Sequence, residues 1–463
     1  MLHKFSMNGL FFVLDINSGA IHTVDELTYF IIDDYKLMSE DEIARRFKSR
    51  FPLEDILEAI NEIRTLEGQG MLFSPDAHEI AAKHALRSHE SFLESKAPIV
   101  KALCLHVSHD CNLRCKYCFA SKGGYSGRRQ LMASETGKRA IDFLIASSGS
   151  RRNLEVDFFG GEPTLNFEAV KEIVAYGRSR EKESGKNIRF TLTTNGVLLE
   201  SDMMEFIDKN MTNVVLSIDG RKEVNDEMRI SPSGKGSYEH IVDRLRKMAD
   251  MRGQTGYYVR GTYTRQNLDF SEDVLHLADL GFKQVSVEPV VSPQDEPYSL
   301  RKEDLPALFE QYERLADKME KRRKEGKPFN FFHFNIDLTG GPCLIKRLTG
   351  CGAGTEYLAV TPQGDLYPCH QFVGMEEFKL GDITGGIDNV KLRGEFARCN
   401  VYAKEECLEC WAKFYCSGGC AANAYHQNGS ILKPYELGCE LQKKRIECAL
   451  YLASTEMLEE AEA

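Results

Sequence analysis

Short apolar runs alternate with amphipathic stretches through the middle of the chain. Six runs have the length and the β-branched and aromatic content of strands: 102–108, 155–159, 188–194, 214–218, 259–264 and 284–289. Between them, apolar residues recur at helical spacing over 134–148, 167–183, 201–210, 237–252 and 271–280. These repeats predict an α/β fold whose parallel sheet curves into a partial (β/α)6 barrel over 99–325, open because a closed barrel needs eight units. Active sites of such sheets lie at the C-terminal strand ends.

The first 75 residues predict a small separate unit. The runs 11–16 and 20–24 flank Asn17-Ser18-Gly19, a good hairpin turn, and 70–73 is predicted to be a closing strand. Helical spacing covers 26–35, the stretch after Ser39 and 53–67. This order of elements indicates a winged-helix-like unit over 1–75, and the polar residues 76–98 are predicted to form a helical linker.

The C-terminal region, 326–463, has a different character. Residues 340–450 are rich in glycine and turns and hold ten cysteines. A small module of this kind is typical of proteins in which metal sites replace a large apolar core.

Charge and hydropathy exclude some classes of protein. The chain has 463 residues and a formal net charge of −11, which argues against a nucleic-acid binder or a peripheral protein on an anionic membrane. No apolar run approaches the length of a membrane span, and the run Leu10–Leu14 is too short for a signal peptide and is followed by Asp15. We therefore expect a cytoplasmic protein.

The 14 cysteines are unevenly distributed, and none lies between Cys118 and Cys343. In a reduced compartment, tight groups of cysteines indicate metal ligation, because thiolates select zinc and iron–sulfur clusters. Cys111, Cys115 and Cys118 form a CxxxCxxC motif directly after the first barrel strand. This loop can give three thiolates to a [4Fe–4S] cluster and leave one iron open, or it can be a zinc loop that lacks one ligand.

Further motifs follow the later strands in the order seen in one known superfamily. Gly160-Gly161-Glu162-Pro163 follows the second strand, Ser217-Ile218-Asp219-Gly220 follows the fourth, and Arg229 comes next. With the cysteine loop, these motifs resemble the radical S-adenosylmethionine (SAM) superfamily. The resemblance implies that Gly160, Gly161 and Glu162 hold the SAM amine, that Ser217 and Asp219 meet the ribose, and that Arg229 binds the carboxylate. It also implies that Tyr117 and Phe119 are the aromatic neighbours of the cluster and the adenine.

The C-terminal cysteines resemble the SPASM extension of peptide-modifying radical SAM enzymes, which holds two auxiliary [4Fe–4S] clusters. The resemblance implies that Cys407, Cys410, Cys416 and Cys439 ligate the distal cluster. It implies that Cys351, Cys369 and Cys420 ligate the cluster nearer the SAM site, with Cys343 as an ambiguous fourth ligand. Two structural zinc sites are the alternative for this run. Cys104, Cys399 and Cys448 are interpreted as ordinary buried cysteines.

The whole pattern is similar to clostridial thioether-forming maturases of SCIFF peptides. The resemblance implies that the chain crosslinks cysteines of a ribosomally made precursor peptide after hydrogen abstraction by a 5′-deoxyadenosyl radical. It implies leader-peptide binding by 1–75 and a flavodoxin- or ferredoxin-type electron donor. Sulfatase maturases carry an aspartate base where this chain has His370, which weakens that interpretation. A formylglycine-forming maturase, a carbon–carbon crosslinking enzyme and a non-catalytic zinc-bearing peptide adaptor remain alternatives.

Overall fold

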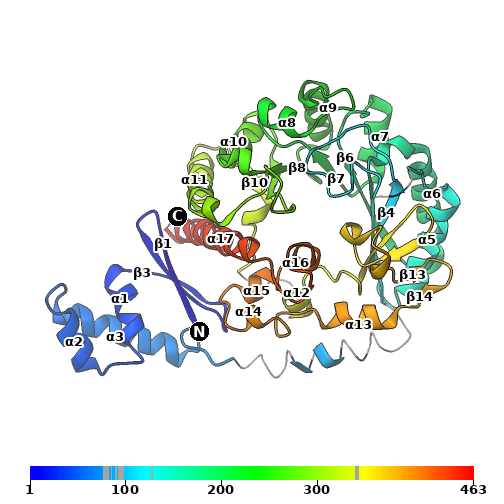
Figure 1. Ribbon diagram of the computed structural model, residues 1–463. Coiled ribbons are helices and arrows are strands. Elements are labelled where there is room, and N and C mark those ends of the chain that lie inside the picture. The colour runs from blue at the N-terminus through cyan, green and yellow to red at the C-terminus, as the bar shows by residue number, and fades with distance from the viewer. Residues whose placement is uncertain are drawn as a thin grey trace.

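The computed structural model describes residues 1–76, 83–84, 86–88, 91, 99–125, 127, 129–338 and 344–462. Its largest element is an 11-stranded sheet with the order β10-β9-β8-β7-β6-β5-β4-β11-β12-β13-β14. The sheet curves around a central space, with helices outside it (Figure 1). The predicted α/β architecture is confirmed.

All six predicted barrel strands are present, and each pairs in parallel with the next. They are β4 (Ala102–Ser108), β5 (Asn153–Gly160), β6 (Asn187–Thr194), β7 (Asn213–Ser217), β8 (Tyr257–Tyr263) and β9 (Gln284–Pro289). The predicted helices between them are α5 (Ser134–Ser147), α6 (Phe167–Ser184), α7 (Ser201–Asn210), α9 (Tyr238–Met251) and α10 (Phe270–Asp279). Two further helices were not predicted, α8 (Lys222–Met228) and α11 (Leu305–Lys324).

The parallel sheet is wider than the sequence predicted. β10 (Asn330–Phe331) pairs in parallel with β9, and β11 (Tyr357–Val360) pairs in parallel with β4. Three short antiparallel strands follow: β12 (Asp365–Tyr367), β13 (Gly381–Asp382) and β14 (Gly386–Ile387). The sheet therefore continues across the boundary expected at 325, and the C-terminal region is built onto it.

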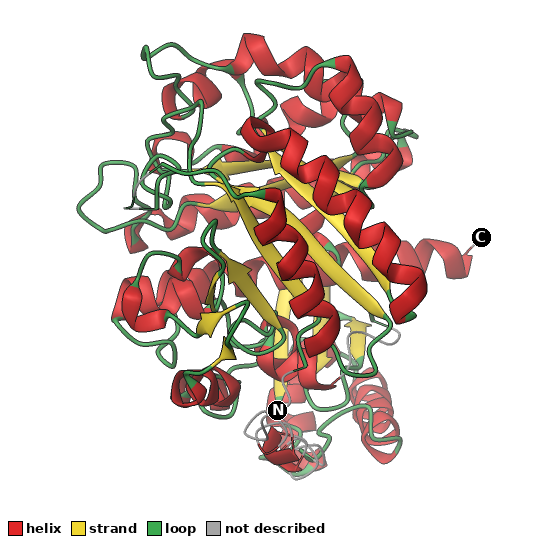
Figure 2. Cartoon of the chain, turned by 90° about the vertical axis from the view of Figure 1, so that its right-hand side faces the viewer, coloured by secondary structure: helices red, strands yellow, loops and turns green. Residues whose placement is uncertain are grey.

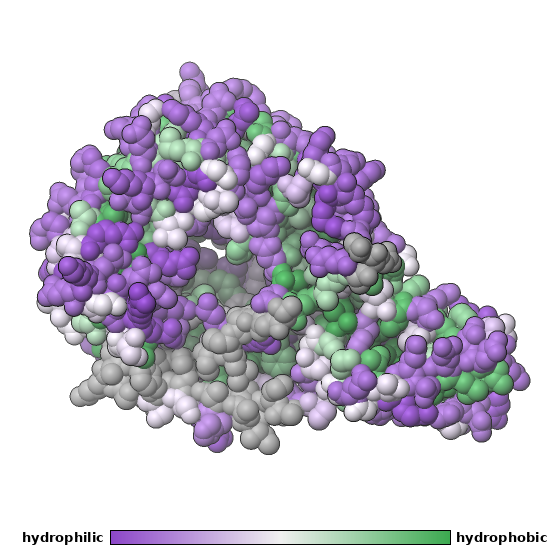
Figure 3. All heavy atoms as spheres, turned by 180° about the vertical axis from the view of Figure 1, so that it is seen from behind, coloured by the Kyte–Doolittle hydropathy of each residue, from purple (hydrophilic) through white to green (hydrophobic). Residues whose placement is uncertain are grey.

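The barrel strands bury one face under helices and turn the other toward a hollow. On β5, Leu154, Val156 and Phe158 are wholly buried. Asp157 and Phe159, whose side chains point to the opposite face of the strand, are partly accessible. Helices lie across the outer face of the sheet in Figure 2. Seen from behind, the molecule is hollowed at the centre of the barrel (Figure 3). The partly accessible side chains, such as those of Asp157 and Phe159, therefore face an internal space.

The N-terminal unit joins a three-stranded antiparallel sheet to three helices. The strands are β1 (Leu2–Met7), β2 (Leu10–Asp15) and β3 (Ile21–Val24), and the helices are α1 (Glu26–Asp34), α2 (Glu40–Phe47) and α3 (Leu53–Gly68). The expected strand at 70–73 is wrong, since these residues form bends, and β1, which was not predicted, pairs with β2 instead.

One face of this small sheet covers its own helices, and the other face joins the main core. Val13 packs with the helices, whereas Phe5, Phe12 and Leu14 belong to the core that also holds the barrel. The His3 ring stacks on Trp411 at 3.6 Å between centroids. The unit projects from the barrel beside α17 (Figure 1).

The C-terminal region consists of short helices around the cysteines and one long helix. The helices are α12 (Leu344–Thr349), α13 (Val390–Arg398), α14 (Glu405–Leu408), α15 (Lys413–Cys416), α16 (Ala421–Asn428) and α17 (Glu436–Glu462). In the predicted linker 76–98 the described positions between 83 and 91 are helical, and the remainder beyond 76 lies outside the described residues. No described helix is long and apolar enough to cross a membrane.

Candidate active site and cysteine-lined cavities

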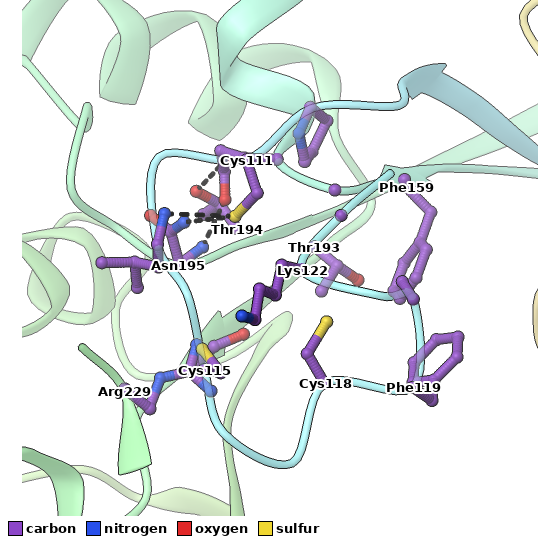
Figure 4. Close-up of a pocket in the computed structure, with 18 of the residues that line it drawn as sticks. Cys111, Cys115, Cys118, Phe119, Lys122, Phe159, Thr193, Thr194, Asn195 and Arg229 are labelled. Atoms are coloured by element: carbon purple, nitrogen blue, oxygen red, sulfur yellow. Dashed lines mark hydrogen bonds between the residues drawn. The ribbon is translucent and has the colours of Figure 1, made fainter. Parts of the chain in front are cut away.

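A cavity of about 150 Å³ lies at the C-terminal ends of neighbouring parallel strands. Loops after β4 and β5, the ends of β6 and β7, and Arg229 after α8 form its wall (Figure 4). The lining includes these predicted site residues: Cys111, Cys115, Cys118, Tyr117, Phe119, Gly160, Gly161, Glu162, Ser217 and Arg229. The motifs from distant parts of the sequence thus meet in one place.

The cysteine loop is held against the segment that follows α8. The backbone N–H of Arg114 donates to the Ile230 carbonyl at 2.6 Å, and that of Lys116 donates to the Met228 carbonyl at 2.9 Å. Burial raises the pKa of Cys111 to about 12 and that of Cys115 to about 11. Both thiols are therefore protonated at neutral pH until an electron-deficient metal group displaces the protons.

Two glycines allow the loops after β4 and β5 to touch. Gly160 has a φ of +129°, and a Cβ there would lie 2.1 Å from the Ser108 carbonyl oxygen. A Cβ on Gly161 would lie 2.2 Å from the Asp110 carbonyl oxygen. This close approach lets the Gly161 backbone N–H donate to the Ser108 carbonyl oxygen at 2.7 Å. Any larger residue at either position would push the cysteine loop away from the cavity.

Glu162 fixes this corner to the end of β6. Its Oε1 accepts hydrogen bonds from the Thr164 and Thr194 hydroxyls at 2.6 and 2.8 Å, and its Oε2 accepts from the Asn195 backbone N–H at 2.8 Å. The side chain is 1% exposed, and burial raises the pKa of its carboxyl group. Because Oε2 accepts a single bond, it keeps capacity for a second donor such as an ammonium group.

Asp219 lies behind the cavity wall rather than in it. Its carboxylate, 0% exposed, accepts the Tyr117 hydroxyl at 2.7 and 2.9 Å and lies 3.6 Å from Arg229 Nη1. Arg229 Nη1 also donates to the Tyr117 hydroxyl at 2.8 Å. Asp219 therefore orients two lining side chains, and it is not itself among the lining residues, so the expected ribose contact has no support from this geometry.

The sequence reasoning missed part of this wall. Thr193, Thr194 and Asn195 line the cavity from the end of β6, together with Lys122 and Phe159. In Figure 4 the Lys122 side chain points into the space between the three thiols. Thr193 and Thr194 end the predicted strand 188–194 and Asn195 follows it, so the rule that active-site residues lie at the C-terminal ends of strands was sufficient to find them.

A second cavity, of about 300 Å³, lies in the C-terminal region. Its wall includes all four thiols expected around the distal cluster: Cys407, Cys410, Cys416 and Cys439. Burial raises the pKa of Cys439 to about 12, and the charges of the other three cysteines contribute to this increase. Within the described ranges, no three Cys, His, Asp or Glu side chains form a site for a metal ion. The four cysteines instead line a common cavity.

Cys351, Cys369 and Cys420 form a third group. Burial raises the pKa of Cys369, and the nearby Cys420 and Cys351 raise it further. Cys420 is separated from Cys416 by Ser417, Gly418 and Gly419, which all have left-handed backbone angles, with φ of +58°, +80° and +73°. This turn lets neighbouring cysteines belong to different groups. Cys343 lies outside the described residues, and Cys104, Cys399 and Cys448 are buried.

Comparison with known proteins identifies the barrel. The Radical SAM superfamily matches residues 105–287. An uncharacterized protein of Methanocaldococcus jannaschii is 30% identical over 305 residues, which are 65% of this chain and 96% of that protein. The chain belongs to the radical SAM superfamily. It is therefore an enzyme whose chemistry uses SAM and a [4Fe–4S] cluster.

Two further proteins resemble this radical SAM chain, one in sequence and one in fold. A cysteine-type anaerobic sulfatase-maturating enzyme of Clostridium novyi is 24% identical over 68% of this chain and 86% of its own length. The SuiB protein of Streptococcus suis, solved with SAM and with its precursor peptide SuiA, has a TM-score of 0.52 at 17% identity. That fold similarity covers 93% of this chain and 97% of SuiB.

Proposed function

We propose that this radical SAM enzyme forms intramolecular cysteine thioether crosslinks in a ribosomally made, cysteine-rich precursor peptide. The observation that carries the proposal is the arrangement of cysteines in three groups, one at the SAM cavity and two in the C-terminal region. A second redox centre is useful for thioether formation, because joining carbon to sulfur removes two hydrogens and therefore two electrons from the peptide.

The first cavity fits a [4Fe–4S] cluster with SAM. Cys111, Cys115 and Cys118 supply three thiols, and the Arg229 Nε has no hydrogen-bond partner among the described residues although it is buried. In the proposal these thiols bind the cluster and Arg229 binds the SAM carboxylate. When bound, cluster and SAM together would supply an agent that abstracts hydrogen from carbon.

The remaining lining residues orient the cofactor. Glu162 Oε2 and the Gly160–Gly161 backbone would hold the amino group, and Ser217 would bind the ribose. Tyr117 and Phe119 would lie beside the cluster and the adenine. The hollow beyond this cavity would hold the peptide and limit the access of water to the reactive centre.

In the proposal the C-terminal region is a SPASM domain. Cys407, Cys410, Cys416 and Cys439 would ligate the distal auxiliary cluster, and Cys351, Cys369 and Cys420 the nearer one. Four thiols across one cavity are the donor set that a four-iron cluster needs. The turn at 417–419 accounts for the close spacing of two cysteines with different partners.

The N-terminal unit is proposed to bind the leader of the precursor. β3 lies at the edge of its sheet, so an extended peptide could add there as a further strand and contact α3. Leu53 and Leu57 of α3 are 56% and 44% exposed, which leaves apolar surface for such a peptide. SuiB, which has a similar fold, was solved with a precursor peptide.

Formylglycine formation is less well supported than thioether formation. His370 stands where the sulfatase maturases are expected to carry an aspartate base, and it lies between the Phe119 and Phe159 rings. Burial lowers the pKa of His370 to about 4. This ring is a much weaker base than an ordinary histidine and differs in charge from an aspartate.

Mass spectrometry of the peptide product tests the proposal. Purified enzyme, SAM, an anaerobic reductant and the precursor encoded beside the enzyme should give a peptide that has lost two hydrogens and one alkylatable thiol per crosslink. Loss of two hydrogens with every thiol still alkylatable would show a carbon–carbon crosslink instead. Loss of the cysteine sulfur would show formylglycine formation.

A further inference from the structure

One lysine in the C-terminal region is buried between two groups of cysteines. Lys404 is 2% exposed, and it lines a small cavity together with Cys351 and Cys399. Its ammonium group donates to the Gly418 carbonyl oxygen at 2.5 Å. Gly418 lies in the turn between Cys416 and Cys420 and also lines the cavity of the distal cysteines. The ammonium group therefore lies next to both groups of thiols.

This buried cation has no carboxylate to balance it. Across the described residues, no Asp or Glu oxygen lies within ion-pair distance of Lys404. Lys413 and Lys443, which line the distal cavity, differ from Lys404 in this respect. Lys413 Nζ lies 3.9 Å from Asp76 Oδ2, and Lys443 Nζ lies 2.8 Å from Glu440 Oε1. A buried ammonium group with no carboxylate beside it is costly even when neutral groups such as the Gly418 carbonyl accept from it, so its presence points to an anionic partner.

We infer that Lys404 is the internal counter-charge of the two auxiliary clusters and raises their reduction potentials. The inference rests on the proposed function, because it requires those clusters. Three or four thiolates around a [4Fe–4S] cluster give it a net negative charge, and each one-electron reduction adds one more negative charge. A fixed positive charge at short range in a dry environment favours the reduced form. Lys404 would thus help the auxiliary clusters to accept the electron that leaves the peptide.

The test compares reduction potentials in three variants of the full-length protein. Lys404→Met removes the charge and keeps the length of the side chain, Lys404→Arg keeps the charge, and Lys443→Met removes a paired lysine from the distal cavity. Dithionite supplies the electrons in a titration followed by electron paramagnetic resonance. The cluster signal that changes when SAM is added identifies the first cluster.

At the wild-type midpoint, the auxiliary clusters of Lys404→Met should show a reduced-to-oxidised ratio about tenfold lower, a shift of about 59 mV. The first cluster and the auxiliary clusters of Lys404→Arg should stay close to wild type, and Lys443→Met should shift the auxiliary potentials less than Lys404→Met, because Lys443 is paired with Glu440 and 32% exposed. Unchanged auxiliary potentials in Lys404→Met with full iron content would overturn the inference. If wild-type protein held only about four irons per chain, the proposal of auxiliary clusters would be wrong, and this inference would be wrong with it.

The cluster-free protein gives a second readout, which does not depend on loading. If Lys404 serves the clusters, its charge is unbalanced without them, and cluster-free Lys404→Met should melt at the same or a higher temperature than wild type. If Lys404→Met fails to load iron but its cluster-free form melts at the same or a higher temperature than wild type, the counter-charge role is supported. A clearly lower melting temperature would show that Lys404 only braces the turn at Gly418, and the inference would be wrong.

Discussion

At the scale of single residues, the shape of the candidate site depends on a buried carboxylate that does not line it. Asp219 is wholly buried and holds the Tyr117 hydroxyl, and Arg229 donates to the same hydroxyl. Charge-assisted bonds in such a dry place are stronger than those at the surface. Asp219 therefore positions two lining side chains, whereas Ser217 of the same motif lines the cavity itself.

Replacing Arg229 with alanine should weaken SAM binding without removing iron. The variant loses one charge-assisted contact with the SAM carboxylate, worth about 1.5–3 kcal/mol, or roughly tenfold to a hundredfold in affinity. Equilibrium binding of SAM to the iron-loaded protein measures the effect. Arg244→Ala is the control, because Arg244 pairs with Glu200 at the surface, away from the cavity. Equal affinity in both variants would remove Arg229 from the binding site.

Asp219→Asn should act mainly on stability. The buried carboxylate accepts hydrogen bonds from Tyr117 and from the Thr262 backbone N–H, and the amide can accept them only more weakly. We expect the free energy of unfolding of the cluster-free protein to fall by about 1.5–3 kcal/mol. Denaturant titration measures this change. A variant that unfolds like wild type but loses SAM affinity would restore the ribose contact expected from the sequence.

Assembly of the first cluster should depend steeply on pH. The pKa values of Cys111 and Cys115, about 12 and 11, lie above the ordinary value for a thiol, and only thiolates bind iron. Below pH 11, each pH unit therefore raises the thiolate fraction of either residue about tenfold. Anaerobic reconstitution should be faster at pH 8.5 than at pH 7, followed by the cluster signal that responds to SAM. A rate independent of pH would contradict this view of the loop.

At the scale of elements, long buried strands were predictable and short edge strands were not. β4 to β9 are continuous apolar or alternating runs, because each is buried under helices. β10 has two residues and β11 has four, which is too little sequence for a pattern. β1 carries Lys4 and Ser6 within a half-buried run, so its amphipathic pattern was not recognised.

The candidate site shows the same division. Its motif residues are local in sequence, so they could be found without a structure, and the structure brings them to one cavity. Lys122 and Phe159 belong to no motif, and their place at the cavity depends on the path of the loops. The burial of Asp219 depends on packing between β7, β8 and the cysteine loop, which no local pattern encodes.

The free edge of β3 permits a sharp test of leader binding. The Asp15 N–H donates to the Ala20 carbonyl oxygen, so the hydrogen-bonded pairs of this antiparallel ladder continue at Val13–His22 and Phe11–Val24. The N–H of Thr23 therefore points away from β2, to the open edge. Thr23→Pro removes that donor without breaking the β2–β3 ladder. Binding of full-length precursor should weaken about tenfold, while SAM cleavage without peptide is unchanged.

Ser6→Pro is the matched control for Thr23→Pro. The Ile16 N–H donates to the Met1 carbonyl oxygen, so by the same alternation the N–H of Ser6 points to the outer edge of β1. This substitution removes an equivalent donor from the opposite edge of the same sheet. Equal losses of precursor affinity in the two variants, measured by fluorescence anisotropy, would show a general effect on the unit rather than strand addition to β3.

At the scale of the whole molecule, the N-terminal unit is not an appendage that can simply be removed. Phe5, Phe12 and Leu14 are buried in the main core, and His3 stacks on Trp411 and bonds to Glu447 of α17. A chain that begins at residue 76 would expose this apolar face to water. Its behaviour would report on stability as well as on leader binding, and substitutions at the β3 edge are therefore the cleaner experiment.

The first group of cysteines and the distal group are built on separate supports, and this predicts independent loading. Cys111, Cys115 and Cys118 lie on a loop of the barrel sheet, whereas Cys407 and Cys416 lie on short helices, Cys410 on the turn between them and Cys439 on α17. Replacing the first three with alanine should abolish formation of 5′-deoxyadenosine and leave about eight irons per chain, four in each auxiliary cluster. Anaerobic iron analysis and chromatography of the SAM products measure both quantities. Retained SAM cleavage would contradict the assignment of the first loop, and loss of nearly all iron would show that the auxiliary clusters cannot form without it.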